Sequence, residues 1–277
     1  MKSVGEAREI ILQSVPAALE EKLPLLQAHR RVLAETVIAE ADIPAFDNSS
    51  MDGFALSSED TQRANQSIPV TLQLAGEVAA GSVLSQAIPA GSAVRIMTGA
   101  PIPRGANAVI EQEAVVARNG IVQVGIPVAE GRNIRKKGED IRSGATILEL
   151  GTLMKAAHLG VLASLGVSHV SVYRKPTVAF LATGNELVDL SQEPEEGQIR
   201  NSNAYTLWGL VEESGGVPVN LGTAKDDEHE LMEKLRRGLS YDMLMTSGGV
   251  SVGAYDYVLK ALEDLGVQRK FWKVNIK

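Results

Sequence analysis

The C-terminal third of the chain alternates between uninterrupted apolar runs and segments with apolar residues at helical spacing. The run at 177–183 (TVAFLAT) is typical of a strand that is buried on both faces. Strands are expected at 177–183, 217–224 and 241–246, and helices at 203–214, 227–239 and 254–265. Because strands and helices alternate along the chain, this part is predicted to form a parallel sheet with helices on its faces.

The N-terminal pattern predicts helices. Ser3 and Glu6 have the spacing of a capping box, and the apolar residues that follow them keep a helical period. A second, short helix is expected at 26–34, and a third at 153–164, which we expect to pack with the first two. A strand is expected to follow at about 170–172.

Between Asp42 and Arg135 the hydrophobic pattern changes to short apolar segments separated by glycine and proline. This pattern is typical of short strands joined by turns. The predicted strands lie at 70–78, 93–97, 106–116 and 121–128. A small barrel or sandwich is therefore expected in the middle of the chain.

Composition narrows the classes of function. The chain has 277 residues, no cysteine and four histidines without paired spacing, which excludes thiol chemistry and disfavours a histidine metal site. The formal net charge of −7, the lack of a long basic run and the aromatic content of 4% disfavour nucleic-acid binding. The N-terminus lacks the apolar core of a signal peptide, and the longest uncharged stretch, 156–173, fits a helix, a turn and a strand better than a membrane span. A cytoplasmic protein without membrane contact is therefore expected.

Each of the three predicted C-terminal strands ends in polar residues. In open α/β sheets ligands bind beyond the carboxyl ends of the strands, so these residues are expected on one rim. Glu186, Asp226 and Asp256 would bring three carboxylates to this rim, which suits a hard cation such as Mg²⁺. The glycine-rich segment 247–253 (SGGVSVG) offers backbone N–H groups to a phosphate or another oxyanion. The residues therefore predict an oxyanion site that also holds Mg²⁺.

Each of these signals also has a plainer structural explanation. The glycine-rich segment is as typical of a tight turn, and a carboxylate such as Asp226 or Asp227 is as typical of a helix N-cap. Lys273 and Lys277 lie four residues apart in an extended segment, which puts both on one face, where they would hold a dianion unless they are merely solvated. Plain loops are also the simplest explanation of two segments dense in turn-forming residues, 47–53 and 97–101.

Seven short sequence motifs, taken together, are similar to those of one known family. They are FDNSSMDGFA at 46–55, RIMTGAPIP at 95–103, GANAV at 105–109, GEDI at 138–141, TGNEL at 183–187, RNSN at 200–203 and SGGVSVG at 247–253. In this order they resemble the molybdopterin molybdenumtransferase family, which includes bacterial MoeA proteins and the E domain of gephyrin. The resemblance runs from Ser3 to Lys277, whereas SGGVSVG alone would also fit other pterin-binding domains of the molybdenum-cofactor type.

The resemblance implies an α/β multidomain protein. It places an elongated helical and β linker and dimerisation domain at 1–43 and 136–175, and a β-rich, barrel-like domain at 44–135. The remaining part, 176–277, would be an α/β molybdopterin-binding domain with a parallel sheet, incomplete at its C-terminus. The resemblance also implies a homodimer whose active site lies between the pterin-binding domain of one subunit and the β-rich domain of the other. A molybdopterin adenylyltransferase is the expected upstream partner.

The activity that the resemblance implies belongs to molybdenum cofactor biosynthesis. It is the insertion of molybdate into adenylylated molybdopterin, with release of AMP and a requirement for Mg²⁺. Such a reaction asks for charge neutralisation and positioning rather than a covalent nucleophile. The lack of cysteine and of a catalytic triad is consistent with this chemistry.

The resemblance assigns roles residue by residue. From the β-rich domain, Asp52 and Thr98 would contribute to catalysis, while Lys273 and Lys277 would attract molybdate and phosphate. The residues that would organise Mg²⁺, pyrophosphate and water are Glu186, Asp226 and Asp256. The residues that would line the pterin and nucleotide pocket are Thr183, Gly184, Asn201, Ser202, Ser247, Gly248 and Gly249.

The chain departs from the family pattern in two respects. Asn185 stands where many members have Asp, although gephyrin-like members are the same here. The family also continues beyond Lys277, so we expect a C-terminally truncated chain whose sheet lacks its last strands and part of the anion site, and which would be inactive if that missing part is essential for turnover. The alternative function is a gephyrin-like scaffold or a pterin-binding fragment without turnover, and the MDG and MTGAP phrases disfavour a nucleotide amidohydrolase. An enzymatic function is favoured over a scaffold because the chain contains all four acidic residues, which a scaffold would not need. These are Asp52, Glu186, Asp226 and Asp256.

Overall fold

The structure is a computed structural model, and it describes residues 1–225, 227–248 and 257–276. The chain divides into two compact units, which we call the α/β unit and the β-rich unit. The α/β unit comprises Met1–Glu35, Gly151–Ala156 and His169–Lys277, and the β-rich unit comprises Thr36–Leu150 and Ala157–Ser168. The three-domain division expected from the sequence stays a prediction.

A parallel sheet of three strands forms the centre of the α/β unit, in the order β16–β13–β17. β13 (Thr177–Thr183) lies between β16 (Val217–Ala224) and β17 (Met243–Ser247). All five residues from Val178 to Ala182 are buried, as the uninterrupted apolar run predicts. The parallel sheet expected from the alternating pattern is therefore confirmed.

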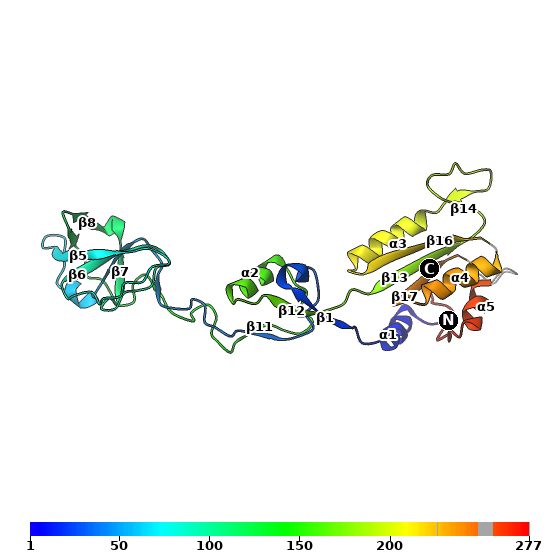
Figure 1. Ribbon diagram of the computed structural model, residues 1–277, viewed down its shortest axis with the longest axis horizontal. Coiled ribbons are helices and arrows are strands. Elements are labelled where there is room, and N and C mark those ends of the chain that lie inside the picture. Colours follow the sequence, from blue (N-terminus) through cyan, green and yellow to red (C-terminus); the bar gives the residue numbers. More distant parts are fainter. Residues whose placement is uncertain (226, 249–256, 277) are drawn as a thin grey trace. The chain divides into compact units, whose positions relative to one another are not determined.

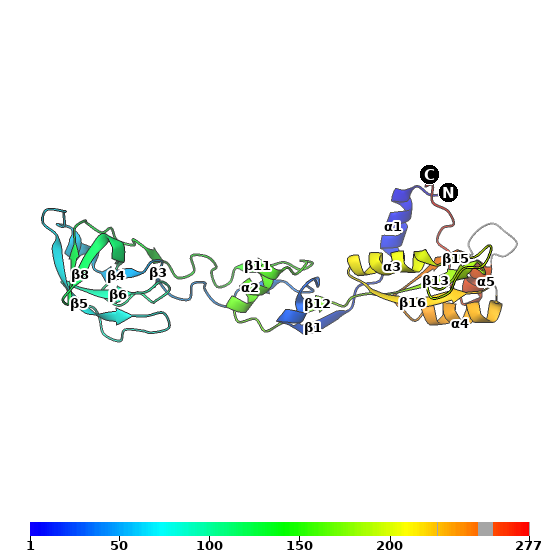
Figure 2. The same cartoon turned by 90° about the horizontal axis from the view of Figure 1, so that it is seen from above.

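Helices cover both faces of this sheet (Figure 1). Figure 2 shows α3 (Ser202–Glu213) on one face and α4 (Glu228–Gly238) on the other, where α5 (Tyr257–Asp264) packs beside α4. The predicted helices at 203–214 and 227–239 are thus confirmed to within a residue or so at each end. The first residues of the helix expected at 254–265 lie outside the described part of the chain.

The two faces of β13 are buried by different helices because successive strand residues point to opposite sides. Ala179 and Leu181 pack in a cluster with residues of α4 and α5. On the other face, the ring of Phe180 meets Trp208 of α3 edge to face, with 6.5 Å between the ring centroids. A continuous apolar run is therefore needed for this strand.

The chain opens with α1 (Val4–Ser14), whose predicted capping box is present. The Ser3 hydroxyl accepts a hydrogen bond from the Glu6 N–H at 3.3 Å, and the Glu6 carboxylate accepts one from the Ser3 N–H at 2.8 Å. In Figure 2, α1 lies on the same side of the sheet as α3.

The prediction of a helix at 26–34 is wrong. Only a short 3₁₀ helix, η1 (Leu25–Ala28), forms, and Arg30 then adopts a left-handed conformation with a φ of 60°. Leu33 forms a bridge to Val172 further on. Extended pairing with distant segments therefore replaces the local helix.

A strand that the sequence pattern did not indicate precedes this turn. β1 (Glu20–Pro24) pairs antiparallel with β12 (His169–Tyr173), from Glu20 opposite Tyr173 to Pro24 opposite His169. Every second residue of β1 is exposed, so the segment has no apolar run that would have indicated a strand. β12 confirms the strand expected at about 170–172.

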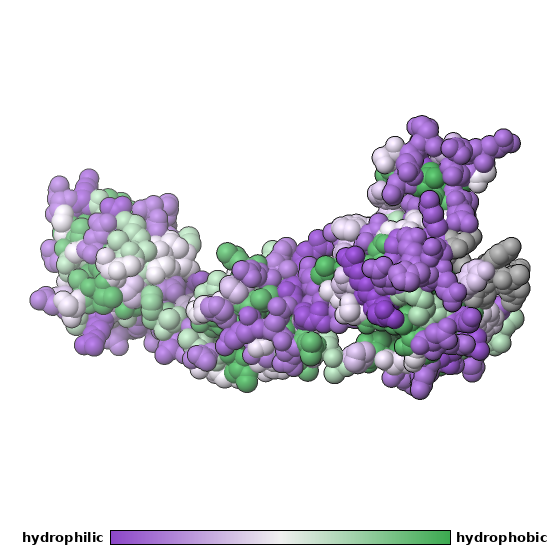
Figure 3. Space-filling view, turned by 45° about the vertical axis from the view of Figure 1, so that its right-hand side comes forward, coloured by the Kyte–Doolittle hydropathy of each residue, from purple (hydrophilic) through white to green (hydrophobic). Residues whose placement is uncertain are grey.

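A hydrophilic loop projects from the α/β unit between two short parallel strands. These are β14 (Leu187–Val188) and β15 (Ile199–Arg200). The loop lies at the top of Figure 1, and the same place in Figure 3 is mostly hydrophilic. Its acidic residues are Asp189, Glu193, Glu195 and Glu196.

The β-rich unit is built on a mixed sheet of six strands in the order β7–β4–β6–β5–β9–β8. Neighbouring strands are antiparallel except for β5 and β6, and the sheet is curled in both views (Figures 1 and 2). The strands are β4 (Gly53–Leu56), β5 (Val70–Val78), β6 (Ser92–Ile96), β7 (Ala108–Glu111), β8 (Val115–Arg118) and β9 (Ile121–Val124).

In this region one prediction is wrong and one strand was missed. The single strand predicted at 106–116 is divided between β7 and β8 by a 3₁₀ helix, η3 (Gln112–Ala114). β4 was not predicted, yet all four of its residues are buried. Phe54 packs into one apolar cluster and Ala55 into another on the opposite face of the sheet.

Smaller elements complete the description. They are η2 (Ser58–Thr61), β2 (Val37–Ile38) paired with β11 (Thr146–Leu148), β3 (Asn48–Ser49) paired with β10 (Ile134–Arg135), and α2 (Ala156–Ser164). α2 begins later than the helix expected at 153–164. Over the described residues, every helix is too short or too polar to cross a lipid bilayer.

Candidate active-site clusters

The carboxyl ends of β13 and β17 approach each other closely at Thr183 and Gly248. A methyl group added to Gly248, whose φ is 90°, would lie 2.6 Å from the carbonyl oxygen of Thr183 and 3.1 Å from its Oγ1. Glycine is therefore required here by both conformation and space. The Oγ1 of Thr183 is buried and has no hydrogen-bond partner among the described residues. An unpaired polar atom thus lies at the predicted rim.

Gly184 and Glu186 form a tight turn directly after β13. The φ of Gly184 is 145°, and a methyl group there would overlap the Glu186 carboxylate. The side chain of Glu186 therefore folds back over the end of the strand. The N–H of Leu187 donates to the carbonyl of Gly184 at 3.4 Å and closes the turn.

Asn201 connects the start of α3 to the end of β16. It is buried, and its Oδ1 accepts a hydrogen bond from the Ala204 N–H at 3.2 Å, so it is the N-cap of α3. Its Nδ2 donates to the Oγ1 of Thr223 at 3.2 Å. Ser202, the first residue of α3, is exposed at the same helix end.

Asn203 makes the corresponding connection to β17. Its Nδ2 donates to the Oγ of Ser247 at 3.0 Å. Neither Asn203 nor Thr223 was predicted from the sequence to be a site residue. The RNSN phrase contained Asn203, but nothing local indicated that its partner would be a serine 44 residues further along the chain.

Several predicted site residues lie outside the described part of the chain. They are Asp226, Gly249, Asp256 and Lys277. Asp227, the neighbour of Asp226, is the N-cap of α4, because its Oδ1 accepts from the N–H groups of His229 and Glu230 at 2.8 and 3.0 Å. These bonds lower the pKa of the Asp227 carboxyl. For this carboxylate the plainer explanation is therefore correct.

The predicted magnesium ligands suit the ion chemically, since all three are carboxylates. Glu186 is the only one of them that the structure describes, and its carboxylate lies at the end of β13. In the described ranges no group of three Asp, Glu or His side chains is close enough to hold a metal. The set of donors fits Mg²⁺, and its assembly stays a prediction.

Lys273 lies in a C-terminal segment that is held by the start of the chain. The N–H of Lys2 donates to the Lys273 carbonyl, and the N–H of Asn275 donates to the Lys2 carbonyl, both at 2.8 Å. Within the described ranges, no hydrogen bond or ion pair joins Lys273 to the other predicted site residues. Its expected role toward an anion stays a prediction.

The predicted site residues of the β-rich unit, Asp52 and Thr98, are in direct contact. Asp52 Oδ1 accepts hydrogen bonds from both the N–H and the hydroxyl of Thr98, each at 2.7 Å. These two bonds, with a smaller contribution from the charge of Arg95, lower the pKa of the Asp52 carboxyl. Asp52 and Thr98 are both exposed, so an ionised carboxylate is presented to solvent.

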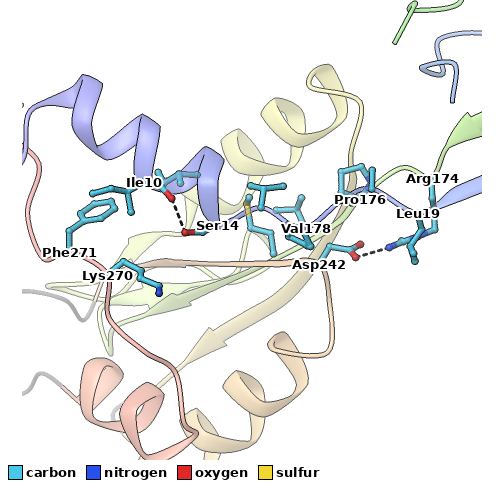
Figure 4. A pocket seen from close by; sticks show the side chains of 15 residues that line it. Ile10, Ser14, Leu19, Arg174, Pro176, Val178, Asp242, Lys270 and Phe271 are labelled. Atoms are coloured by element: carbon cyan, nitrogen blue, oxygen red, sulfur yellow. Dashed lines mark hydrogen bonds and ion pairs between the residues drawn. The ribbon is translucent and has the colours of Figure 1, made fainter. Parts of the chain in front are cut away.

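A cavity of about 730 Å³ lies at the opposite end of the parallel sheet (Figure 4). Its walls come from α1, from the segment that follows α1, from the first residues of β13 and β17, and from Lys270 and Phe271 near the C-terminus. Most of these residues are apolar, and the charged pair Arg174 and Asp242 at its edge is joined at 2.6 Å. The cavity lies at the amino ends of the strands and is therefore separate from the predicted rim.

Comparisons with known proteins agree with this arrangement. Residues 2–166 match the sequence profile of the MoeA N-terminal region (domain I and II), and residues 179–277 match that of a probable molybdopterin binding domain. The chain is 39% identical over 280 residues to the molybdopterin molybdenumtransferase of Haemophilus influenzae, a match that covers all of this chain and 68% of the relative. It is 38% identical to that of Bacillus subtilis, covering 94% of this chain and 60% of the relative.

A solved structure has the same fold. The molybdopterin biosynthesis MoeA protein of Pyrococcus horikoshii superimposes with a TM-score of 0.83 at 37% identity, covering 90% of this chain and 66% of that one. The chain thus spans about two thirds of the length of these relatives. On the strength of both profiles and of relatives matched over the whole chain, this protein belongs to the MoeA family of molybdopterin molybdenumtransferases.

Proposed function

We propose that the protein inserts molybdate into adenylylated molybdopterin, releasing AMP, as a step of molybdenum cofactor biosynthesis. The names of its relatives support the reaction class. The observation that carries the proposal is the gathering of predicted site residues at the carboxyl ends of the parallel strands. These residues are Thr183, Gly184, Glu186, Asn201, Ser247 and Gly248.

Within this proposal the α/β unit binds the anionic substrate. The N-terminus of α3 has a partial positive charge, and hydroxyl groups at the strand ends offer further polar contacts. Glu186, together with Asp226 and Asp256, would hold Mg²⁺, which would neutralise negative charge on the phosphate groups. Lys273 and Lys277 would attract the molybdate dianion.

The β-rich unit supplies an ionised carboxylate. Two hydrogen bonds from Thr98 hold Asp52 in one orientation and favour its charged form. Asp52 therefore acts as a hydrogen-bond acceptor or as a further oxygen ligand for a cation, and Thr98 acts by positioning it. We propose that a homodimer brings Asp52 of one subunit to the strand ends of the other, and that a molybdopterin adenylyltransferase supplies the substrate.

Binding of adenylylated molybdopterin, measured by calorimetry with and without Mg²⁺, tests this proposal. The unaltered protein is expected to bind more tightly with Mg²⁺, and Glu186→Gln is expected to lose most of that difference, because it removes one charged oxygen ligand. Glu233→Gln is the matched control, since it removes the same charge from an exposed position on α4. An equal effect of Mg²⁺ on both variants would contradict the role of Glu186. Tight binding without any release of AMP would instead favour a pterin-binding fragment or scaffold.

A further inference from the structure

Three hydroxyl side chains lie at the ends of the three parallel strands. Thr183 is the last residue of β13, Ser247 is the last of β17, and Thr223 is the last but one of β16. All three side chains are partly buried. A row of hydroxyls at this edge can either donate hydrogen bonds to a ligand or accept them from it.

Two asparagine side chains donate hydrogen bonds to two of these hydroxyls and thereby orient the hydroxyl protons. Asn201 Nδ2 donates to Thr223 Oγ1 at 3.2 Å, and Asn203 Nδ2 donates to Ser247 Oγ at 3.0 Å. An amide nitrogen only donates, so each hydroxyl oxygen is the acceptor and keeps its own proton for another partner. Among the described residues neither Thr223 Oγ1 nor Ser247 Oγ donates to a protein acceptor.

Asn203 differs from Asn201 in the other interactions of its side chain. Asn201 is buried and is the N-cap of α3, which is a structural role. Asn203 is exposed, and the bond to Ser247 is the only hydrogen bond that its side chain makes in the described part of the chain. In the described part of the chain, the Asn203 side chain therefore stabilises the fold mainly through its contact with Ser247.

We propose that Asn203 is a positioning residue that makes the Ser247 hydroxyl a hydrogen-bond donor to a phosphate oxygen of the substrate. This inference rests on the proposed function and names the substrate group that Ser247 contacts. Phosphate oxygens accept hydrogen bonds, so they match a hydroxyl that already accepts one bond from Asn203 and whose proton is directed to another partner. The buried Oγ1 of Thr183, which has no hydrogen-bond partner among the residues that the structure describes, and the N-terminus of α3 favour an anion at the same edge.

Calorimetric titration with AMP and with adenosine tests the proposal, because the two ligands differ only in the phosphate. Asn203→Asp is expected to weaken AMP binding about tenfold or more, since a carboxylate accepts the hydrogen bond that the Ser247 hydroxyl would otherwise donate to the phosphate, and adds a negative charge. Asn203→Ala is expected to weaken it about threefold, because the hydroxyl is no longer oriented. Adenosine binding is expected to change by less than about twofold in both variants.

Two controls isolate the contact. Asn220→Asp adds the same charge on β16 and keeps the one acceptor role of that side chain, so AMP binding should be unaffected. In a Ser247→Ala background, Asn203→Ala should have no further effect. Thermal unfolding of each variant checks that it is folded.

The outcomes separate this inference from the proposed function. If the unaltered protein binds AMP and Asn203→Ala binds it equally well, the role of Asn203 is refuted while the proposed function stands. Equal weakening of AMP and adenosine would also refute it, because the phosphate would not be the group that Ser247 contacts. Failure of the unaltered protein to bind AMP at all would contradict both proposals.

Discussion

Gly53 illustrates how strongly a single residue can constrain the β-rich unit. It is buried at the start of β4, and a methyl group there would overlap the carbonyl oxygen of Ile110 on β7. The close approach of the two strands therefore depends on the absence of a side chain.

We expect Gly53→Ala to destabilise the protein by about 2 kcal/mol or more, because the backbone of β7 must move to make room. Gly160→Ala is the matched control, since Gly160 lies in α2 with open space around its Cα. That substitution should stabilise the protein by about 0.5–1 kcal/mol, because alanine favours helix. Chemical denaturation of both variants measures the two effects, and equal stabilities would contradict the packing at Gly53.

At the scale of residues, the sequence located polar groups correctly when their position followed from a strand end. Glu186 and Ser247 are examples, because each adjoins a strand with a clear apolar pattern. Asn203 and Thr223 were missed, because their importance depends on side-chain bonds across 44 and 22 residues of chain. Asp227 was identified only as one of two candidate caps, since Asp226 has the same chemistry at the preceding position.

At the scale of elements, three strands have the bounds predicted from the sequence, namely β5, β13 and β16. An uninterrupted apolar run that is buried along its length defines β13, whereas β5, most of whose residues are exposed, was delimited by the glycine and proline residues around it. β4 was missed because it follows a segment dense in turn-forming residues and is only four residues long. The helix expected at 26–34 did not form, because long-range pairing of Leu33 outweighed its local pattern.

The starts of β13 and β17 are tied together by one carboxylate. Asp242 accepts hydrogen bonds from Arg174 at 2.6 Å and from the N–H and hydroxyl of Thr177, each at 2.7 Å. The guanidinium of Arg174 and the two bonds from Thr177 lower the pKa of Asp242 well below its ordinary value of 3.8.

This lowered pKa predicts a loss of stability in acid. A carboxyl group with a lower pKa in the folded state stabilises the fold above its unfolded pKa, and the contribution is lost as the pH falls through the folded pKa. Asp242→Asn is expected to cost about 1 kcal/mol at neutral pH, a modest value because solvent screens the pair. The difference from the unaltered protein should shrink as the pH falls below 3.8.

Denaturant unfolding at a series of pH values measures this difference. Asp189→Asn is the control, because it removes a carboxylate from the exposed loop between β14 and β15. A difference that stays constant down to the lowest pH would show that the ionised form of Asp242 is not what ties the two strands.

At the scale of the whole molecule, the chain presents its predicted site residues in two separate units. Asp52 and Thr98 belong to the β-rich unit, and Glu186 belongs to the α/β unit. The local patterns did not indicate that these residues act together, and only the resemblance of the motifs to a family did. A homodimer with a composite site is the proposal that assigns both units to one reaction.

Mixing two inactive variants tests the composite site. We expect Asp52→Ala and Asp256→Ala to be inactive alone and to recover part of the activity when subunits exchange, because both defects then fall in one site and the other site is intact. Light scattering of the mixture verifies dimers, and a tagged subunit verifies exchange. Lack of recovery after verified exchange would show that each site is built within one chain.

The proposed activity is the transfer of molybdenum to the pterin with release of AMP. To test it, the protein is incubated with adenylylated molybdopterin and Mg²⁺, and AMP is followed by chromatography with and without molybdate. We expect AMP release that requires Mg²⁺, is stimulated by molybdate and is abolished by Asp52→Ala in otherwise folded protein. AMP release that is independent of Mg²⁺, or no release from protein that binds the substrate, would contradict it.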